Sequence, residues 1–106
     1  MKIEDVLKSL EREKVKYAII GGVAVVLYGY VRFTKDIDLV IDLSRGNLKR
    51  FVKALSVLNF RPGVPIDPMD ISDVNKREEW IKNKNAKVIT FYNPKSQLLQ
   101  VDVLIT

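Results

Sequence analysis

Two aspartates, Asp36 and Asp38, stand two positions apart at the start of a run that alternates between polar and apolar residues. In a strand, residues two apart point to the same face, with their Cα atoms about 6.5–7 Å apart. Two carboxylates across this span can share one or two divalent cations. Taken alone, the pair is weak evidence, because an Asp-x-Asp at a strand edge is more often solvated or caps a turn.

The glycine pair Gly21-Gly22 lies between residues 16–20, an apolar run that predicts a strand, and residues 23–28, which predict a buried helix ended by Gly29. Backbone N–H groups at the start of a helix, together with the helix dipole, favour an anion. Glycine has no Cβ, so a phosphate can come close to the backbone. The pattern is neither a P-loop nor a Rossmann fingerprint, and a tight turn without a ligand is the simpler interpretation of this pair alone.

A third carboxylate, Asp102, lies within the strand-forming run 99–105. A charge flanked on both sides by apolar residues is costly unless it faces a polar site or a partner. Two interpretations stay open: Asp102 faces the same site as the other aspartates, or it points outward from an edge strand.

Together, these three features resemble the nucleotidyltransferase superfamily. The pattern of that superfamily is Gly-Gly or Gly-Ser, a helix, Asp-x-Asp, and a distant third Asp on a later strand. Here 13 residues separate Gly22 from Asp36. The segment 20–38 is most similar to the minimal, prokaryotic-type branch related to abortive-infection toxins, and the resemblance covers residues 15–106. It implies the nucleotidyltransferase fold, a small mixed sheet with helices packed mainly on one side.

The resemblance also implies a role for each site residue. Gly21 and Gly22 would bind nucleotide phosphates through their N–H groups. Asp36 and Asp38 would coordinate Mg²⁺ (or Mn²⁺) on those phosphates, and Asp102 would complete a second metal site near the acceptor hydroxyl. The implied activity is transfer of a nucleoside monophosphate from an NTP to a hydroxyl of RNA, a protein or a small molecule, with the three aspartates as catalytic residues.

Three more residues, in the polar connection 30–35, are candidates for nucleotide binding: Arg32, Thr34 and Lys35. Arg32 and Lys35 suit contacts with phosphate oxygens, although flexible solvated charges are an equally good interpretation. Thr34 either bonds a phosphate or caps the turn, and the turn is the preferred interpretation.

The composition restricts the chemistry. The chain has 106 residues, no Cys and no His, which excludes disulfides, Cys-based zinc sites, thiol nucleophiles and His-containing triads. Any metal must be held mainly by carboxylate and carbonyl oxygens, which indicates Mg²⁺ or Mn²⁺. The net charge of +5 mildly favours an anionic partner. Because the start does not resemble a secretory signal and the longest uncharged run falls short of the ~20 apolar residues of a membrane span, we expect a cytoplasmic domain with no membrane contact.

The hydrophobic pattern predicts one domain over residues 1–106. It predicts a helix at 3–13, a second helix that follows Ser44 as its N-cap, and strands at 16–20, 37–42, 86–92 and 98–105. Residues 61–75 contain three of the four prolines and predict a loop. Asn75 and Glu78 resemble a capping box that opens a helix through Lys84, and residues 93–97 predict a hairpin. This order indicates an α/β or α+β domain with a small mixed sheet.

Two features differ from the superfamily pattern. Members with documented transfer activity often have Gly-Ser where this chain has Gly21-Gly22, and the chain ends four residues after Asp102. We therefore expect either a domain trimmed after the third Asp strand or a surface completed by another chain. If the last strand is at an edge, self-association or a partner protein is expected there.

Three functions remain open at this point. The first is the metal-dependent nucleotidyltransferase. The second is a noncatalytic nucleotide-binding or partner-binding module, such as one member of a toxin–antitoxin pair. The third is a purely structural α/β domain.

Overall fold

The computed structural model describes residues 2–20 and 36–106, which form an α/β arrangement around a five-stranded mixed sheet. The strand order is β1-β2-β5-β4-β3. The described elements are α1 (Ile3–Arg12), β1 (Tyr17–Ile20), β2 (Asp36–Ile41), α3 (Arg45–Val57), β3 (Arg61–Pro62), the 3-10 helix η1 (Pro68–Ser72), α4 (Val74–Lys84), β4 (Val88–Asn93) and β5 (Ser96–Leu104).

The last strand, β5, is the middle strand of the sheet. It pairs in parallel with β2 on one side and antiparallel with β4 on the other. The interpretation of β5 as an edge strand is therefore wrong, because its backbone is hydrogen-bonded to both neighbours. Self-association through an unpaired last strand loses its structural basis, and the apolar end that suggested it is buried at Val103 and Ile105.

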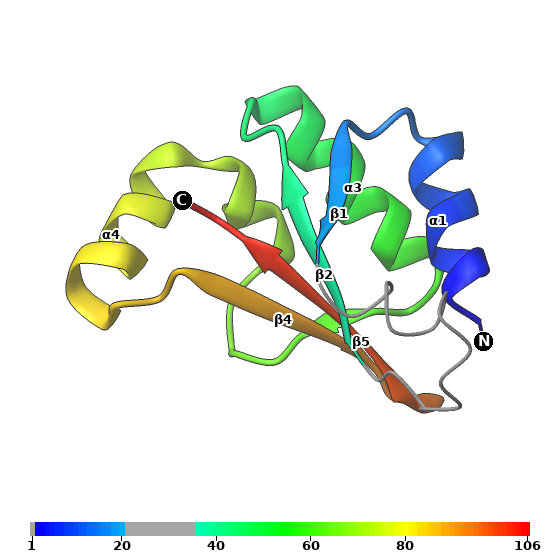
Figure 1. The fold of residues 1–106 in the computed structure, drawn as a ribbon. Helices are drawn as coiled ribbons and strands as arrows, with labels where there is room; N and C mark the ends of the chain where they lie inside the picture. Colours follow the sequence, from blue (N-terminus) through cyan, green and yellow to red (C-terminus); the bar gives the residue numbers. More distant parts are fainter. Residues whose placement is uncertain (1, 21–35) are drawn as a thin grey trace.

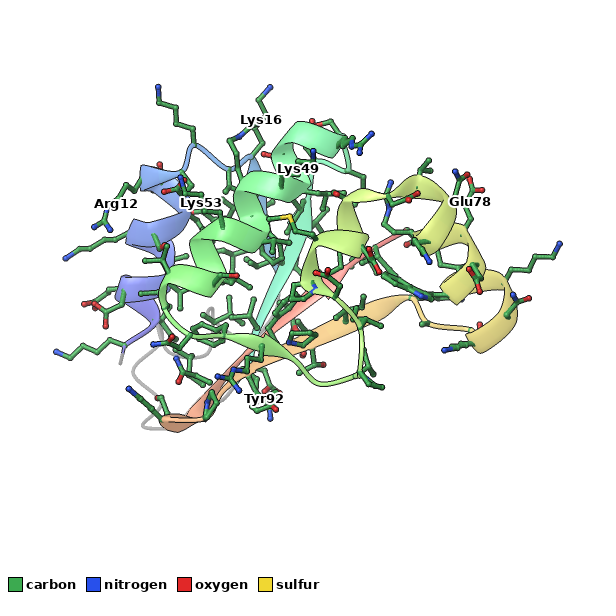
Figure 2. The ribbon with its side chains drawn as sticks, turned by 180° about the vertical axis from the view of Figure 1, so that it is seen from behind. Arg12, Lys16, Lys49, Lys53, Glu78 and Tyr92 are labelled. Carbon is green, nitrogen blue, oxygen red and sulfur yellow. The ribbon has the colours of Figure 1, made fainter. Side chains whose placement is uncertain are left out.

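One face of the sheet packs against α1 and α3. Figure 1 shows α3 behind β1 and β2 with α1 to its side, and Figure 2 shows α3 in front of the sheet when the molecule is seen from the other side. Alternation along β2 sends Ile37, Leu39 and Ile41 into this core, as the period of two predicts. At its centre, the rings of Phe51 and Phe91 meet edge to face, with centroids 5.7 Å apart.

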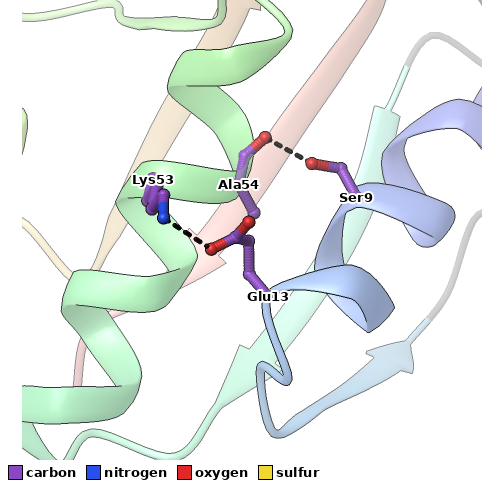
Figure 3. Close-up of polar contacts among 4 residues, drawn as sticks. All are labelled: Ser9, Glu13, Lys53 and Ala54. Atoms are coloured by element: carbon purple, nitrogen blue, oxygen red, sulfur yellow. Dashed lines mark hydrogen bonds and ion pairs between the residues drawn. The ribbon is translucent and has the colours of Figure 1, made fainter.

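The contact between α1 and α3 combines apolar packing with two polar links (Figure 3). The buried Ser9 hydroxyl donates to the Ala54 carbonyl at 2.7 Å. Near the end of α1, Glu13 forms an ion pair with Lys53 at 3.3 Å. The Lys53 side chain is largely exposed, so this pair contributes little, and the buried hydroxyl is the link that fixes the helix positions.

A buried amide ties three elements together. Asn47, in the first turn of α3, is fully buried. Its Oδ1 accepts from the Lys16 N–H at 2.7 Å, and its Nδ2 donates to the carbonyls of Lys16 and Asp42 at 3.0 and 2.8 Å. The start of β1 and the end of β2 are thereby held at the N-terminal end of α3.

Helix caps differ in part from the sequence-based predictions. The N-cap of α4 is Asp73, whose carboxylate accepts from the N–H groups of Asn75 and Lys76, so the capping box expected at Asn75 is wrong. Ser44 is the N-cap of α3 as predicted, but its side chain makes no cap hydrogen bond.

Residues 61–75 are more ordered than a loop. They contain the two-residue strand β3 and the helix η1, where Asp67 accepts from the Met69 N–H as N-cap and Pro68 begins the helix. The expectation of a loop throughout this segment is therefore wrong. Among the helices in the described ranges, none is both long and apolar enough to cross a membrane.

Candidate metal-binding and catalytic site

The sheet face opposite α1 and α3 carries a row of four residues, one from each of four neighbouring strands. Ile20 of β1 pairs with Asp38 of β2, Asp38 pairs with Asp102 of β5, and Asp102 pairs with Thr90 of β4. We call these four residues the acid row. Since neighbouring strands lie about 5 Å apart, the register brings the two carboxylates together although 63 residues lie between them in the sequence.

The positions beside the acid row differ in character. On one side, Asp36 pairs with Gln100, which pairs in turn with Tyr92. On the other side, Val40 pairs with Leu104, and Val40 is 37 % exposed to solvent. The acid row therefore lies between a polar row that contains the third aspartate and a more apolar row.

The surroundings of Asp38 disfavour its negative charge. Burial raises the pKa of Asp38 above its usual value, and a hydrogen bond with Asp102 and the negative charges of Asp102 and Asp36 raise it further. Each of these causes disfavours the ionised form of Asp38. Without a cation, a proton is the positive charge that relieves this repulsion.

Thr90 is a site residue that sequence analysis missed. Its hydroxyl donates to Oδ1 of Asp102 at 2.6 Å, a short hydrogen bond to a charged acceptor. This bond restricts the rotation of the Asp102 carboxylate. No residue type or spacing indicated Thr90, because its place beside Asp102 depends on the register between β4 and β5.

The predicted aspartates are placed as follows. Asp38 and Asp102 are adjacent, and Asp36 lies two positions along β2 on the same face, more exposed than Asp38. Within residues 2–20 and 36–106, no group of three Asp, Glu, His or Cys residues is arranged to hold a metal ion. The role of Asp36 as a metal ligand stays a prediction.

The pair Asp38 and Asp102 nevertheless fits Mg²⁺ or Mn²⁺. Mg²⁺ keeps several waters and is usually bound by one or two carboxylates together with substrate phosphates, so a three-carboxylate cage is not required. A divalent cation would offset the repulsion from Asp102 and Asp36, which together with burial raises the pKa of Asp38.

The predicted nucleotide-binding residues lie outside the described part of the chain: Gly21, Gly22, Arg32, Thr34 and Lys35. Their phosphate contacts stay predictions. The chain nevertheless reaches Gly21 from Ile20, the member of the acid row that pairs with Asp38.

Comparisons with known proteins give no further assignment. The chain matches no protein-family model, no curated protein and no solved structure.

Proposed function

We propose that this chain has the nucleotidyltransferase fold and transfers a nucleoside monophosphate from an NTP to an acceptor hydroxyl, using Mg²⁺ or Mn²⁺. The observation that carries this proposal is the pairing of Asp38 with Asp102, in register, across two parallel strands. The sequence order of the Gly21-Gly22 turn, the Asp36-x-Asp38 motif and the later Asp102 supports the same activity.

The reaction has a defined balance. The acceptor hydroxyl oxygen forms a bond to the α-phosphorus, and the bond from the α-phosphorus to the oxygen that bridges to the β-phosphate breaks. Pyrophosphate leaves, and the hydroxyl proton passes to a carboxylate and from there to water. When bound, the divalent cation neutralises phosphate charge and lowers the pKa of the acceptor hydroxyl.

Each described residue then has a distinct task. Asp38 and Asp102 would hold the divalent cation on one face of the sheet, and Asp36 adds negative charge two positions along β2 on the same face. Thr90 holds the carboxylate of Asp102 in one orientation, which reduces the reorganisation needed when substrate arrives. No histidine is needed as a base, in keeping with a chain that has none.

The test is incubation of the protein with each α-³²P-labelled NTP, MgCl₂ or MnCl₂, and total RNA or cell lysate. Label should move to an acceptor from the α position, whereas a γ-labelled NTP should release its label as pyrophosphate. Asp38→Asn and Asp102→Asn should abolish transfer.

Asp42→Asn is the matched control, because Asp42 directly follows β2 and is exposed but lies outside the acid row. Transfer that persists in Asp38→Asn at the wild-type rate would refute the proposal. NTP binding without transfer in every condition would favour a noncatalytic nucleotide-binding module.

A further inference from the structure

A second candidate site lies beside β4, and Thr90 is the one residue of the acid row that lines it. A cavity of about 420 Å³ is formed by the segment after β3, the end of α4 and the beginning of β4. Figure 1 shows that α4 leads directly into β4 at this end of the sheet. The volume of the cavity lies in the range of small-molecule sites, about 300–1,000 Å³.

The walls of this cavity are fixed by backbone hydrogen bonds. Gly63 N–H donates to the Thr90 carbonyl at 2.8 Å, which fastens the segment after β3 to the edge of β4. The Trp80 carbonyl accepts from the N–H groups of Asn85 and Ala86, where Asn85 adopts the left-handed conformation with φ of 52°. The helix end and both strand-side walls are thus held before any ligand arrives.

The lining is apolar with one positive charge. Val64 and Val88 line the cavity, and 49 % and 48 % of their surfaces are exposed to solvent. Trp80 contributes an aromatic side chain that is otherwise buried in the core. Lys84 is the one charged residue among the described residues that line the cavity.

We propose that this cavity binds a small planar anion, an aromatic ring with one acidic group. Apolar side chains and an indole suit an aromatic ring, which buries the exposed valine surface. Lys84 selects a negative charge over a neutral group, and it fixes the end at which that charge lies.

The same cavity reaches Thr90, whose hydroxyl is bonded to Asp102. The carboxylates of the acid row repel an anion, so the acidic group of the ligand is oriented toward Lys84 and its ring toward Thr90. Binding in this cavity requires no nucleotidyl transfer, so the two proposals can be tested separately.

Trp80 provides a direct reporter, because it is the single tryptophan of the chain. In a ¹⁵N-labelled sample its indole N–H gives one resonance. The probe is 2-naphthoate, and the neutral comparison compound is 2-naphthylmethanol. Titration with 2-naphthoate should shift the indole resonance to saturation, and 2-naphthylmethanol should bind about five-fold more weakly, as expected for one partly exposed ion pair.

Two variant pairs locate the site. Lys84→Gln should reduce affinity for 2-naphthoate to that of the neutral compound, whereas Lys82→Gln, in the same helical turn but away from the lining, should have no effect. Val64→Asp should weaken binding by about ten-fold through charge repulsion. Val57→Asp is its control, since Val57 is 57 % exposed and does not line the cavity.

The absence of a saturable shift would overturn the proposal. Equal affinity for the acid and the alcohol would also overturn it, as would equal effects of Lys82→Gln and Lys84→Gln. Because all four substituted residues are exposed, folding of the variants is expected and is checked from the same ¹⁵N spectra.

Discussion

Replacement of Asp38 by Asn should stabilise the metal-free protein at neutral pH. The substitution keeps the shape of the side chain and removes one of two negative charges that face each other in register across β2 and β5. Like charges directly opposite in a sheet cost roughly 0.2–1 kcal/mol. For a domain of this size, we expect the melting temperature to rise by about 1–4 °C.

The pH dependence of this effect has a defined sign. Burial, the hydrogen bond with Asp102 and the charges nearby raise the pKa of Asp38 above the 3.8 of an unperturbed aspartate. Folding therefore favours protonated Asp38, and its contribution to stability is fully present below pH 3.8 and is lost as pH rises through the folded pKa. The advantage of Asp38→Asn should thus be largest at neutral pH and should disappear as the pH is lowered.

Asp42→Asn is a control with the opposite sign. The Ser44 N–H donates to the Asp42 carboxylate at 2.8 Å, and this hydrogen bond lowers the pKa of Asp42. Stability from Asp42 is therefore present above the unfolded pKa and lost as pH falls through the folded pKa. Asp42→Asn should lower the melting temperature at neutral pH, with a difference that shrinks in acid.

Thermal unfolding between pH 3 and 8, with and without MnCl₂, measures all of these quantities. At a metal concentration ten times Kd, binding should stabilise the wild type by about 1.4 kcal/mol, and Asp38→Asn should lose most of that gain. If Asp38→Asn were less stable than wild type at pH 7, or if its effect did not vary with pH, the reasoning about paired carboxylates would be refuted.

Two further predictions concern the scaffold around the acid row. Thr90→Val should weaken Mn²⁺ binding about ten-fold, because it removes the hydroxyl that orients Asp102, whereas Thr90→Ser should retain most of the affinity; isothermal titration calorimetry distinguishes these outcomes. Asn47→Ala should lower the free energy of unfolding by about 3 kcal/mol in urea titrations, since it removes three hydrogen bonds and leaves the partly buried Lys16 N–H and Asp42 carbonyl without the amide as partner. A loss below 1 kcal/mol would mean that water replaces the amide.

The sequence predicted β2 well because its signal is local. Alternation of Ile37, Leu39 and Ile41 with polar or exposed positions has a period of two, and one buried face is enough to fix which side chains point inward. The same reasoning predicted that Asp36 and Asp38 share a face. Asp102 was harder to assign, because its neighbours show that it lies in a strand but not which strands lie beside it.

The missed features depend on contacts that local patterns do not contain. The strand β3 has two residues, too few for any periodicity, and it exists because it pairs with Tyr92 and Phe91. The helix η1 did leave a signal, Asp67 followed by Pro68, which is a helix start that the proline-rich composition obscured. Thr90 left none, since many strand threonines have no polar partner.

The hydrophobic core and the acid row are two consequences of a single register. Val101 and Val103 are fully buried on the helix-covered face of β5, so Asp102 between them must point to the other face. A slip of one residue between β2 and β5 would place Asp102 in the core and expose both valines, at a cost of several kcal/mol for an unpaired buried carboxylate. The free-energy cost of this slip is far larger than the repulsion between Asp38 and Asp102. The core therefore keeps the two carboxylates opposite each other. A sheet of this kind can keep two carboxylates side by side despite their mutual repulsion.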